Sequence, residues 1–285
     1  MQGATMTPIG SYLRLGFLLL FAGIAQAQLA PPDAGGLRMG HVHLNVTDIP
    51  AQRRFWIGQF DARPLVRQDL EGVIVPGMMI LFTQKAPTHG SEGTVLDHFG
   101  FKVRSRDEMV KSARAAGFVV PREFIGSEGF PNAYITGPDG VKVELQEEAS
   151  QTRRPVVQHF HYLLPEPLKL RDWYVENFAL LPSNRGPYKS ADIPGVNLTF
   201  APNRNPVGGS MKGGMIDHIG FEVANLEAFC KKLEASGVKF DIPYHRDTVL
   251  GLASAFLTDP AGVYIELTEG LKAFDLPPST PPSLK

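Results

Sequence analysis

The feature that most constrains the fold is an internal repeat. The segment VLDHFGFKV at 95–103 returns as MIDHIGFEV at 215–223. Farther along, GPDGVKVEL at 137–145 returns as DPAGVYIEL at 259–267. The equivalent residues are separated by nearly the same length of chain in both pairs, as expected for a duplicated structural unit. The sequence therefore predicts two tandem halves of one design.

A second repeated feature divides each half again. The stretch HVHLN at 41–45 and the stretch HFHYL at 159–163 both place two histidines two residues apart at the start of an apolar run. We interpret the chain as four units, each opening with a strand and continuing through a helix into further strands. Their expected extents are 39–86, 94–149, 156–202 and 214–270. The fold-class prediction is α+β, with four βαβββ modules that form a first domain at 39–150 and a second at 155–271.

The two ends of the chain differ from the repeats. Arg14 precedes the apolar stretch LGFLLLFAGIA at 15–25. At the end of this stretch, Ala25-Gln26-Ala27 form a cleavage site of small residues. This pattern predicts a secretory signal peptide over 1–27, because about 11 apolar residues are too few to span a bilayer. The mature protein is then expected to be exported, to the periplasm or outside the cell. A linker is expected at 28–38 and a disordered Pro-rich tail at 272–285.

Composition excludes several classes of partner. With a net charge of −1, the chain has no basic surface of the kind that binds nucleic acid. No basic helix suggests stable membrane association after signal cleavage, and a homo-oligomer is compatible with the sequence. Cys230, the one cysteine, lies in an apolar helical stripe and is expected to be a packed core thiol.

Candidate metal ligands recur at matching positions in the repeats. Each histidine lies on the opening strand of a unit, and each glutamate lies on a closing strand, where alternation can turn them to one face. The first half offers His41, His98 and Glu144. The second half offers His159, His218 and Glu266. Two imidazoles and one carboxylate form the ligand set of non-haem iron enzymes and of zinc enzymes. The sequence thus predicts a divalent metal (Fe²⁺, Zn²⁺, Mn²⁺ or Ni²⁺).

The pattern DHxGFxV, followed farther along the chain by DPxGxxxEL, resembles the sequence pattern of the vicinal oxygen chelate superfamily. That superfamily includes glyoxalase I, extradiol dioxygenases, methylmalonyl-CoA epimerase and antibiotic-resistance proteins. The resemblance covers about 39–270 and implies U-shaped mixed sheets built from paired modules. It also places the six candidate ligands on the family's metal-binding strands. Function varies within the superfamily.

Departures from the family pattern separate the possible activities. The fourth, acidic ligand of glyoxalase-like sites is replaced by Ile80 in the first unit and by Asn197 in the third. Extradiol dioxygenases also use a histidine and a tyrosine near the metal. His245 stands near the histidine position of the second half, and Tyr134 stands at the tyrosine position of the first. Neither half is a complete dioxygenase site.

The second histidine of each H-x-H pair remains to be placed. His43 and His161 share the strand face of the predicted ligands, and we expect them to be acid–base groups or to orient a ligand. The alternative is that they only form hydrogen bonds in the cavity wall. The sequence favours a metal-dependent enzyme that acts on a small substrate with adjacent oxygens, of extradiol-dioxygenase type. The alternatives are a glyoxalase- or epimerase-like lyase or isomerase and a non-catalytic small-molecule-binding protein of the resistance type.

Overall fold

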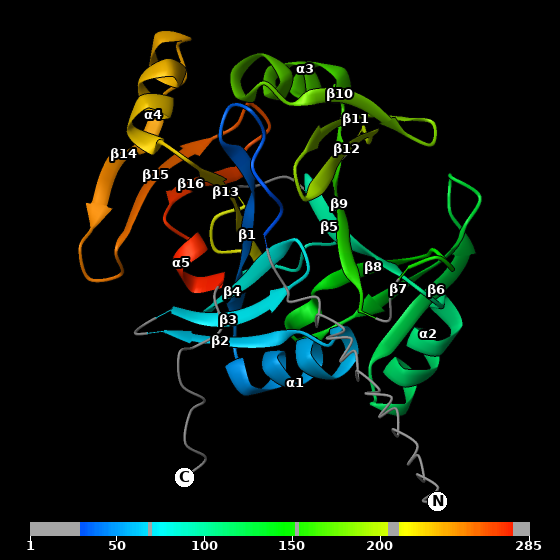
Figure 1. Cartoon of the computed structure of the whole chain (residues 1–285). Coiled ribbons are helices and arrows are strands. Elements are labelled where there is room, and N and C mark those ends of the chain that lie inside the picture. Colours follow the sequence, from blue (N-terminus) through cyan, green and yellow to red (C-terminus); the bar gives the residue numbers. More distant parts are fainter. Residues whose placement is uncertain (1–28, 68–69, 152–153, 205–210, 276–285) are drawn as a thin grey trace, which may run out of the picture.

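The chain folds into four modules of one design, each a strand, a helix and three strands (Figure 1). The computed structural model describes residues 29–67, 70–151, 154–204 and 211–275. The predicted signal peptide at 1–27 lies outside these residues, as does most of the predicted tail. Among the residues described, no helix combines the length and the apolar character that crossing a bilayer requires.

The bounds of the elements match the predicted units closely. The first module contains β1 (Leu37–Val46), α1 (Ile49–Phe60), β2 (Arg63–Arg67), β3 (Leu70–Val75) and β4 (Met78–Gln84). The second contains β5 (Leu96–Val103), α2 (Arg106–Ala115), β6 (Val119–Ile125), β7 (Pro131–Thr136), a 3-10 turn (Pro138–Gly140) and β8 (Lys142–Glu147). The third contains β9 (Val156–Leu164), α3 (Pro167–Phe178), β10 (Leu181–Arg185), β11 (Tyr188–Ile193) and β12 (Val196–Pro202). The fourth contains β13 (Ile216–Val223), α4 (Leu226–Ala235), β14 (Phe240–Asp247), β15 (Leu252–Thr258) and β16 (Tyr264–Glu269), followed by α5 (Lys272–Asp275).

Two eight-stranded mixed sheets are formed, which confirms the predicted fold class. The strand orders are β14-β15-β16-β13-β1-β4-β3-β2 and β10-β11-β12-β9-β5-β8-β7-β6. Each sheet joins two modules through an antiparallel pair of opening strands, β1 with β13 and β5 with β9. The sequence grouped modules one and two in one half and modules three and four in the other, and the strand pairing does not follow this grouping. The outer sheet joins modules one and four, and the inner sheet joins modules two and three (Figure 1).

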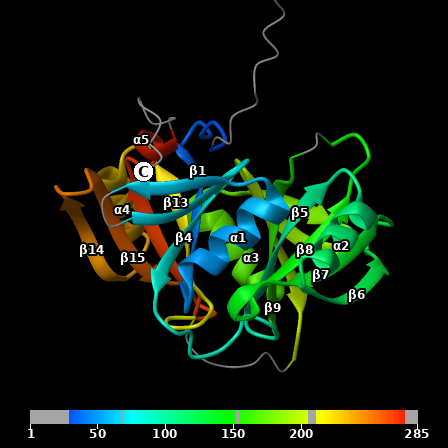
Figure 2. The same cartoon turned by 90° about the horizontal axis from the view of Figure 1, so that it is seen from below.

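A shared core holds the two sheets together. One continuous apolar cluster contains Val42 and Leu44 of the outer sheet and Phe99 and Phe160 of the inner sheet. Helices α1 and α3 lie between the sheets (Figure 2). Trp56 of α1 stacks on Phe99, with ring centroids 5.7 Å apart. The alternate residues of each strand, including the histidine pairs, therefore face away from this core.

The prediction that Cys230 is a packed core thiol is confirmed. Asp48 caps α1 by accepting a hydrogen bond from the Ala51 amide at 2.9 Å. Strand β1 begins at Leu37, within the segment that was expected to be a linker. The tail does not begin at residue 272, because Lys272–Asp275 form α5 and Phe274 is buried against the outer sheet.

Candidate functional site

Two clusters of metal-ligating side chains lie on the faces of the sheets that point away from the shared core. In the inner sheet, ligand atoms of His98, Glu144, His159 and His161 lie within 4.8 Å of one another. In the outer sheet the same is true of His41, His43 and His218, and Glu266 contacts two of them. We call these clusters, each with its glutamate, the inner centre and the outer centre.

The register of the opening strands creates both centres. His43 lies directly opposite His218, and His161 lies directly opposite His98. Two residues along each strand, the first histidine of the H-x-H pair lies opposite a glycine: His41 opposite Gly220, and His159 opposite Gly100. Because side chains two residues apart share a face, both histidines of each pair lie on the sheet face that carries the glutamate of the closing strand.

In the outer centre, two histidines meet one carboxylate oxygen. Glu266 Oε2 lies 3.0 Å from His41 Nε2 and 3.1 Å from His218 Nε2. His43 lies beside them, with its ring centroid 4.6 Å from that of His218. Its Nε2 shares a hydrogen bond of 2.7 Å with Thr83 Oγ1. Residues from the first and last modules therefore form one site.

In the inner centre, the carboxylate is fixed from both sides. Glu144 Oε2 lies 2.8 Å from His98 Nε2 and 3.7 Å from His159 Nε2. Its other oxygen accepts hydrogen bonds from Asn132 Nδ2 at 2.6 Å and from Arg185 Nη2 at 3.3 Å. The ligand oxygen is thus held in place by groups that themselves stay outside the cluster.

Aspartates that precede the histidines of modules two and four orient the rings. His218 Nδ1 donates to Asp217 Oδ1 at 2.8 Å, and His98 Nδ1 donates to Asp97 in the same way. A proton held on Nδ1 leaves Nε2, beside the glutamate, as the nitrogen that would release its proton and bind a metal ion. This role was not predicted from the sequence, although the repeated Asp-His dipeptide indicates it.

Two glycines make room for the opposing histidine rings. A side chain on Gly220 would overlap the His41 ring, and one on Gly100 would overlap the His159 ring. Both glycines follow the Asp-His dipeptide by one residue, in DHIG and DHFG. The motif therefore supplies an oriented ligand together with the space that the partner ligand needs.

Electrostatics separates the histidines of each centre into two kinds. Burial alone lowers the pKa of an imidazole, but hydrogen bonds to Asp217 and Glu266 outweigh it and raise the pKa of His218 to about 9. His98 is also shifted upward against its burial, by Asp97 and Glu144. In the absence of metal these two histidines hold a proton between two carboxylates.

The second histidine of each pair is shifted in the opposite direction. Burial, followed by the charge of His218, lowers the pKa of His43 to about 3. For the same reasons, burial and the charge of His98 hold the pKa of His161 well below its usual value. Both rings are neutral at pH 7 and present lone pairs.

The donor set fits a divalent cation. Both ring nitrogens of His161 and the Nδ1 of His41 are buried without a hydrogen-bond partner among the described residues. An unpaired buried polar atom costs about 1–3 kcal/mol, so these nitrogens favour a ligand. Imidazole nitrogens and a carboxylate oxygen suit zinc, iron, manganese or nickel.

The predicted ligands form the centres in a different grouping from the one expected. His41, His98 and Glu144 do not meet, and neither do His159, His218 and Glu266. The opening-strand histidine of module one joins module four, and that of module three joins module two. Ile80 was placed at the fourth-ligand position, and this is wrong by one residue. Met79 is in register with His41, while Ile80 lies in the shared core.

The four candidate acid–base residues have different surroundings. His43 and His161 lie inside the clusters. Tyr134 lies beside the inner centre, with its ring centroid 5.2 Å from that of His98. His245 lies on β14, and its recorded hydrogen bonds go to Ser254 Oγ and to the Pro243 carbonyl, not to the outer centre.

Comparison with known proteins agrees with this geometry. Residues 157–267 match the family model of the Glyoxalase/Bleomycin resistance protein/Dioxygenase superfamily. Glyoxalase I from Zea mays superposes with a TM-score of 0.65 at 15% identity, over 82% of this chain and 92% of that one. A Bacillus subtilis protein named as a candidate dioxygenase superposes with a TM-score of 0.62 at 12% identity, over 88% of this chain and 92% of that one. No match is found among curated proteins. At these identities the likeness shows the fold alone.

Proposed function

From the membership of this chain in the Glyoxalase/Bleomycin resistance protein/Dioxygenase superfamily, we propose that it is a divalent-metal-dependent enzyme acting on a small substrate with two adjacent oxygens. The observation that carries the proposal is the convergence of two histidines on one glutamate oxygen in each centre. A bound divalent ion would act there as a Lewis acid towards chelated oxygens.

The residues around the inner centre can handle protons. Burial, and then the charge of Glu144, raise the pKa of Tyr134 above its usual value, so the phenol keeps its proton and can donate it to a substrate oxygen. His161 is neutral at pH 7, because burial holds its pKa well below the usual value, and its lone pairs can accept a hydrogen bond or bind a metal ion. In the outer centre Phe256 takes the place of the tyrosine, in register with Glu266.

Extradiol-type oxygenation is the first candidate reaction. A set of two histidines and one carboxylate leaves three positions of an octahedral ion, enough for two substrate oxygens and dioxygen. Proton transfer of the glyoxalase or epimerase kind is the second. The neutral His161 inside the cluster favours it, because a fourth protein ligand would leave an octahedral ion only two open positions, enough for the two substrate oxygens but not for dioxygen as well.

Metal loading followed by two assays tests the proposal. The protein is reconstituted anaerobically with Fe²⁺, Zn²⁺, Mn²⁺ or Ni²⁺, and its metal content is measured by mass spectrometry. Oxygen uptake with catechols supports oxygenation, and exchange of a carbon-bound proton of a 2-hydroxycarbonyl compound in D₂O supports proton transfer. Failure to bind any of these metals would overturn the proposal. Binding of small molecules without metal would point instead to a non-catalytic binding protein.

Export is a separate part of the proposal. Arg14, the apolar stretch at 15–25 and the small residues that end at Ala27 support cleavage before Gln28 and release into the periplasm or the medium. Cell fractionation and mass measurement of the mature protein test it. A chain that keeps its first 27 residues in the cytoplasm would contradict it.

A further inference from the structure

The two centres have similar ligands, but the side chains next to them on the sheets differ. Strand register places a row of side chains next to His161 in the inner sheet, running through Thr199, Ser190 and Ser183. The matching row next to His43 in the outer sheet runs through Leu81, Gly72 and Leu65. One pocket wall is therefore hydroxylated, and the other is aliphatic.

The hydroxyl row has unused hydrogen-bonding capacity. Ser190 and Thr199 are fully buried. Ser190 Oγ has no hydrogen-bond partner in the part of the chain that the structure describes. Thr199 Oγ1 donates to Asn197 Oδ1 at 2.7 Å, which leaves its lone pairs available as acceptors. Buried hydroxyls of this kind normally have partners, so a ligand that supplies them is favoured.

A cavity on the inner sheet reaches one end of this row, at Ser183. This cavity of about 410 Å³ is lined by Ser183, Arg185, Asn197, Asp192, Gln158 and Lys102, among others. Its two cations are already paired, Arg185 with Glu128 at 3.1 Å and with Glu144, and Lys102 with Glu148. The cavity therefore offers hydrogen bonds more than unpaired charge, which suits hydroxyl groups better than a highly charged tail.

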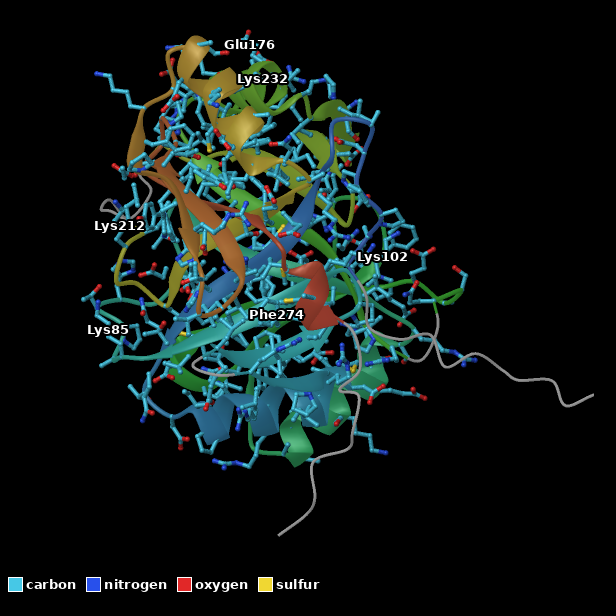
Figure 3. All side chains as sticks on the ribbon, turned by 60° about the vertical axis from the view of Figure 1, so that its left-hand side comes forward. Lys85, Lys102, Glu176, Lys212, Lys232 and Phe274 are labelled. Carbon is cyan, nitrogen blue, oxygen red and sulfur yellow. The ribbon has the colours of Figure 1, made fainter. Side chains whose placement is uncertain are left out.

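In the outer sheet the matching space is filled by the protein itself. One buried cluster lies there. It contains Leu65, Ile74, Met79 and Leu81 of the first module, Leu252 of β15, Leu29, and Leu271 and Phe274 in and just before α5. Figure 3 shows Phe274 on α5 lying against the strands of the outer sheet.

An arginine at the same position of the two sheets marks the difference. Arg67 ends β2 and Arg185 ends β10, each paired with the first residue of the next strand. Arg67 Nη1 donates to the Ala273 carbonyl at 2.7 Å, and its guanidinium lies over the Phe274 ring. Arg185 instead contacts the ligand carboxylate of Glu144. The α5 segment thus occupies in the outer sheet the place that is a cavity in the inner sheet.

We propose that the inner centre is the substrate site and that it takes a small molecule with a chelating pair of oxygens and a hydroxylated tail, which Ser183, Ser190 and Thr199 bind. This inference rests on the proposed function, because the chelating pair is assigned to the metal. In the outer sheet, α5 and the apolar cluster around it fill the corresponding space, so the outer centre does not take the same ligand.

Two probes with the same chelating group and different tails test the inference. Gluconate and mandelate are both 2-hydroxycarboxylates, with a polyhydroxylated tail and a phenyl tail. They are titrated into Co²⁺-loaded protein while the visible cobalt bands are followed. We expect gluconate to bind about tenfold more tightly than mandelate, because a buried polar wall disfavours an apolar tail.

Variants assign the binding to the hydroxyl row. Thr199→Val keeps the shape of the side chain and Ser190→Ala removes one hydroxyl. Each should weaken gluconate by about fivefold and leave mandelate unchanged. His98→Ala should abolish the gluconate response. Phe274→Ala, in the other pocket, is the matched control and should not change gluconate affinity.

Failure of the inference can be distinguished from failure of the proposed function. Tighter binding of mandelate, or a Thr199→Val variant with unchanged gluconate affinity, would overturn the inference while metal binding stands. No cobalt uptake would overturn the proposed function. Calorimetry on the metal-free protein would then decide the inference: gluconate binding that Thr199→Val weakens supports it, and no binding overturns it.

Discussion

His41 Nε2 and Glu266 Oε2 lie 3.0 Å apart although they come from opposite ends of the folded chain. Their contact shows that the outer centre forms only when the last module has paired with the first. The inner centre, by contrast, needs only modules two and three, which follow each other in sequence. The two centres are therefore alike in residue type but differ in how much of the chain must fold before each exists.

This relationship predicts which histidine substitutions act on the same metal ion. We expect about two equivalents of metal in the wild-type protein. The double variant His41→Ala/His218→Ala should keep about one, because both substitutions remove ligands of the outer centre. The variant His41→Ala/His98→Ala should lose both. Mass spectrometry of metal content measures the difference.

The two double variants are controls for each other, because each of them removes two buried histidines. Circular dichroism and thermal unfolding of both variants establish that they fold equally well. Equal metal contents in the two double variants would contradict the grouping of ligands seen in the structure.

The glycines opposite the H-x-H histidines should be as important to the metal as a ligand. In Gly220→Ala the added methyl group overlaps the His41 ring, which is fully buried and has no room to withdraw. We expect the outer centre to lose at least about tenfold in metal affinity, while the inner centre keeps its own. Gly100→Ala should have the reciprocal effect through His159. Competition with a chelating dye measures both affinities.

Gly58→Ala provides the matched control for these two variants. Gly58 lies in α1, and an added methyl group there meets nothing within 4 Å. Alanine should stabilise that helix by about 0.5–1 kcal/mol and leave metal binding unchanged. Wild-type metal affinity in Gly220→Ala would show that the His41 ring is not needed where the structure places it.

The modules and the candidate ligands could be predicted because the same short motifs occur in both halves of the sequence. The Asp-His dipeptide, the glycine that follows and the Pro-Gly turns occur in both halves, so unit boundaries and strand faces could be read directly. These features are local, and local features survive duplication. Tyr134 was placed beside a centre by the family resemblance instead, since Phe256 takes its position in the other half.

The pairing of modules could not be read in the same way. Duplication makes the edges of β1 and β9 chemically equivalent, so either could pair with β5 or β13. The choice depends on packing between modules, such as that of Trp56 against Phe99, which no spacing reveals. The error at Ile80 has a related cause. A shift of one residue turns a strand side chain to the other face, and only the register with His41 fixes it.

The aspartates behind the histidines should tune metal affinity. Asp217→Asn removes the charge that holds the Nδ1 proton of His218, so the ring becomes a poorer and less well oriented ligand. We expect metal affinity at the outer centre to fall by about 10–100-fold, with the inner centre unchanged. Asp97→Asn should do the same at the inner centre only. Each variant is the control for the other, and an unchanged affinity at the matching centre would contradict the role assigned here.

A buried carboxyl remote from both centres should make stability depend on pH. Asp259 accepts hydrogen bonds from the Tyr174 hydroxyl and from the Ala261 and Val263 amides. Burial nevertheless raises its pKa from 3.8 to about 6. Between these two values, the Asp259 carboxyl is protonated in the folded state and ionised in the unfolded chain. Its stabilising contribution is fully present below pH 4, declines as the pH rises through about 6, and is absent above that.

Asp259→Asn separates this contribution from those of other titrating groups. The neutral amide keeps the shape and does not ionise, so the free energy of unfolding of the variant relative to wild type should rise by about 3 kcal/mol between pH 4 and pH 8. Urea unfolding of metal-free protein at several pH values measures it. The direction of the change is the decisive point. A difference between the two proteins that stays constant over this range would show that the Asp259 carboxyl is not destabilised by its burial.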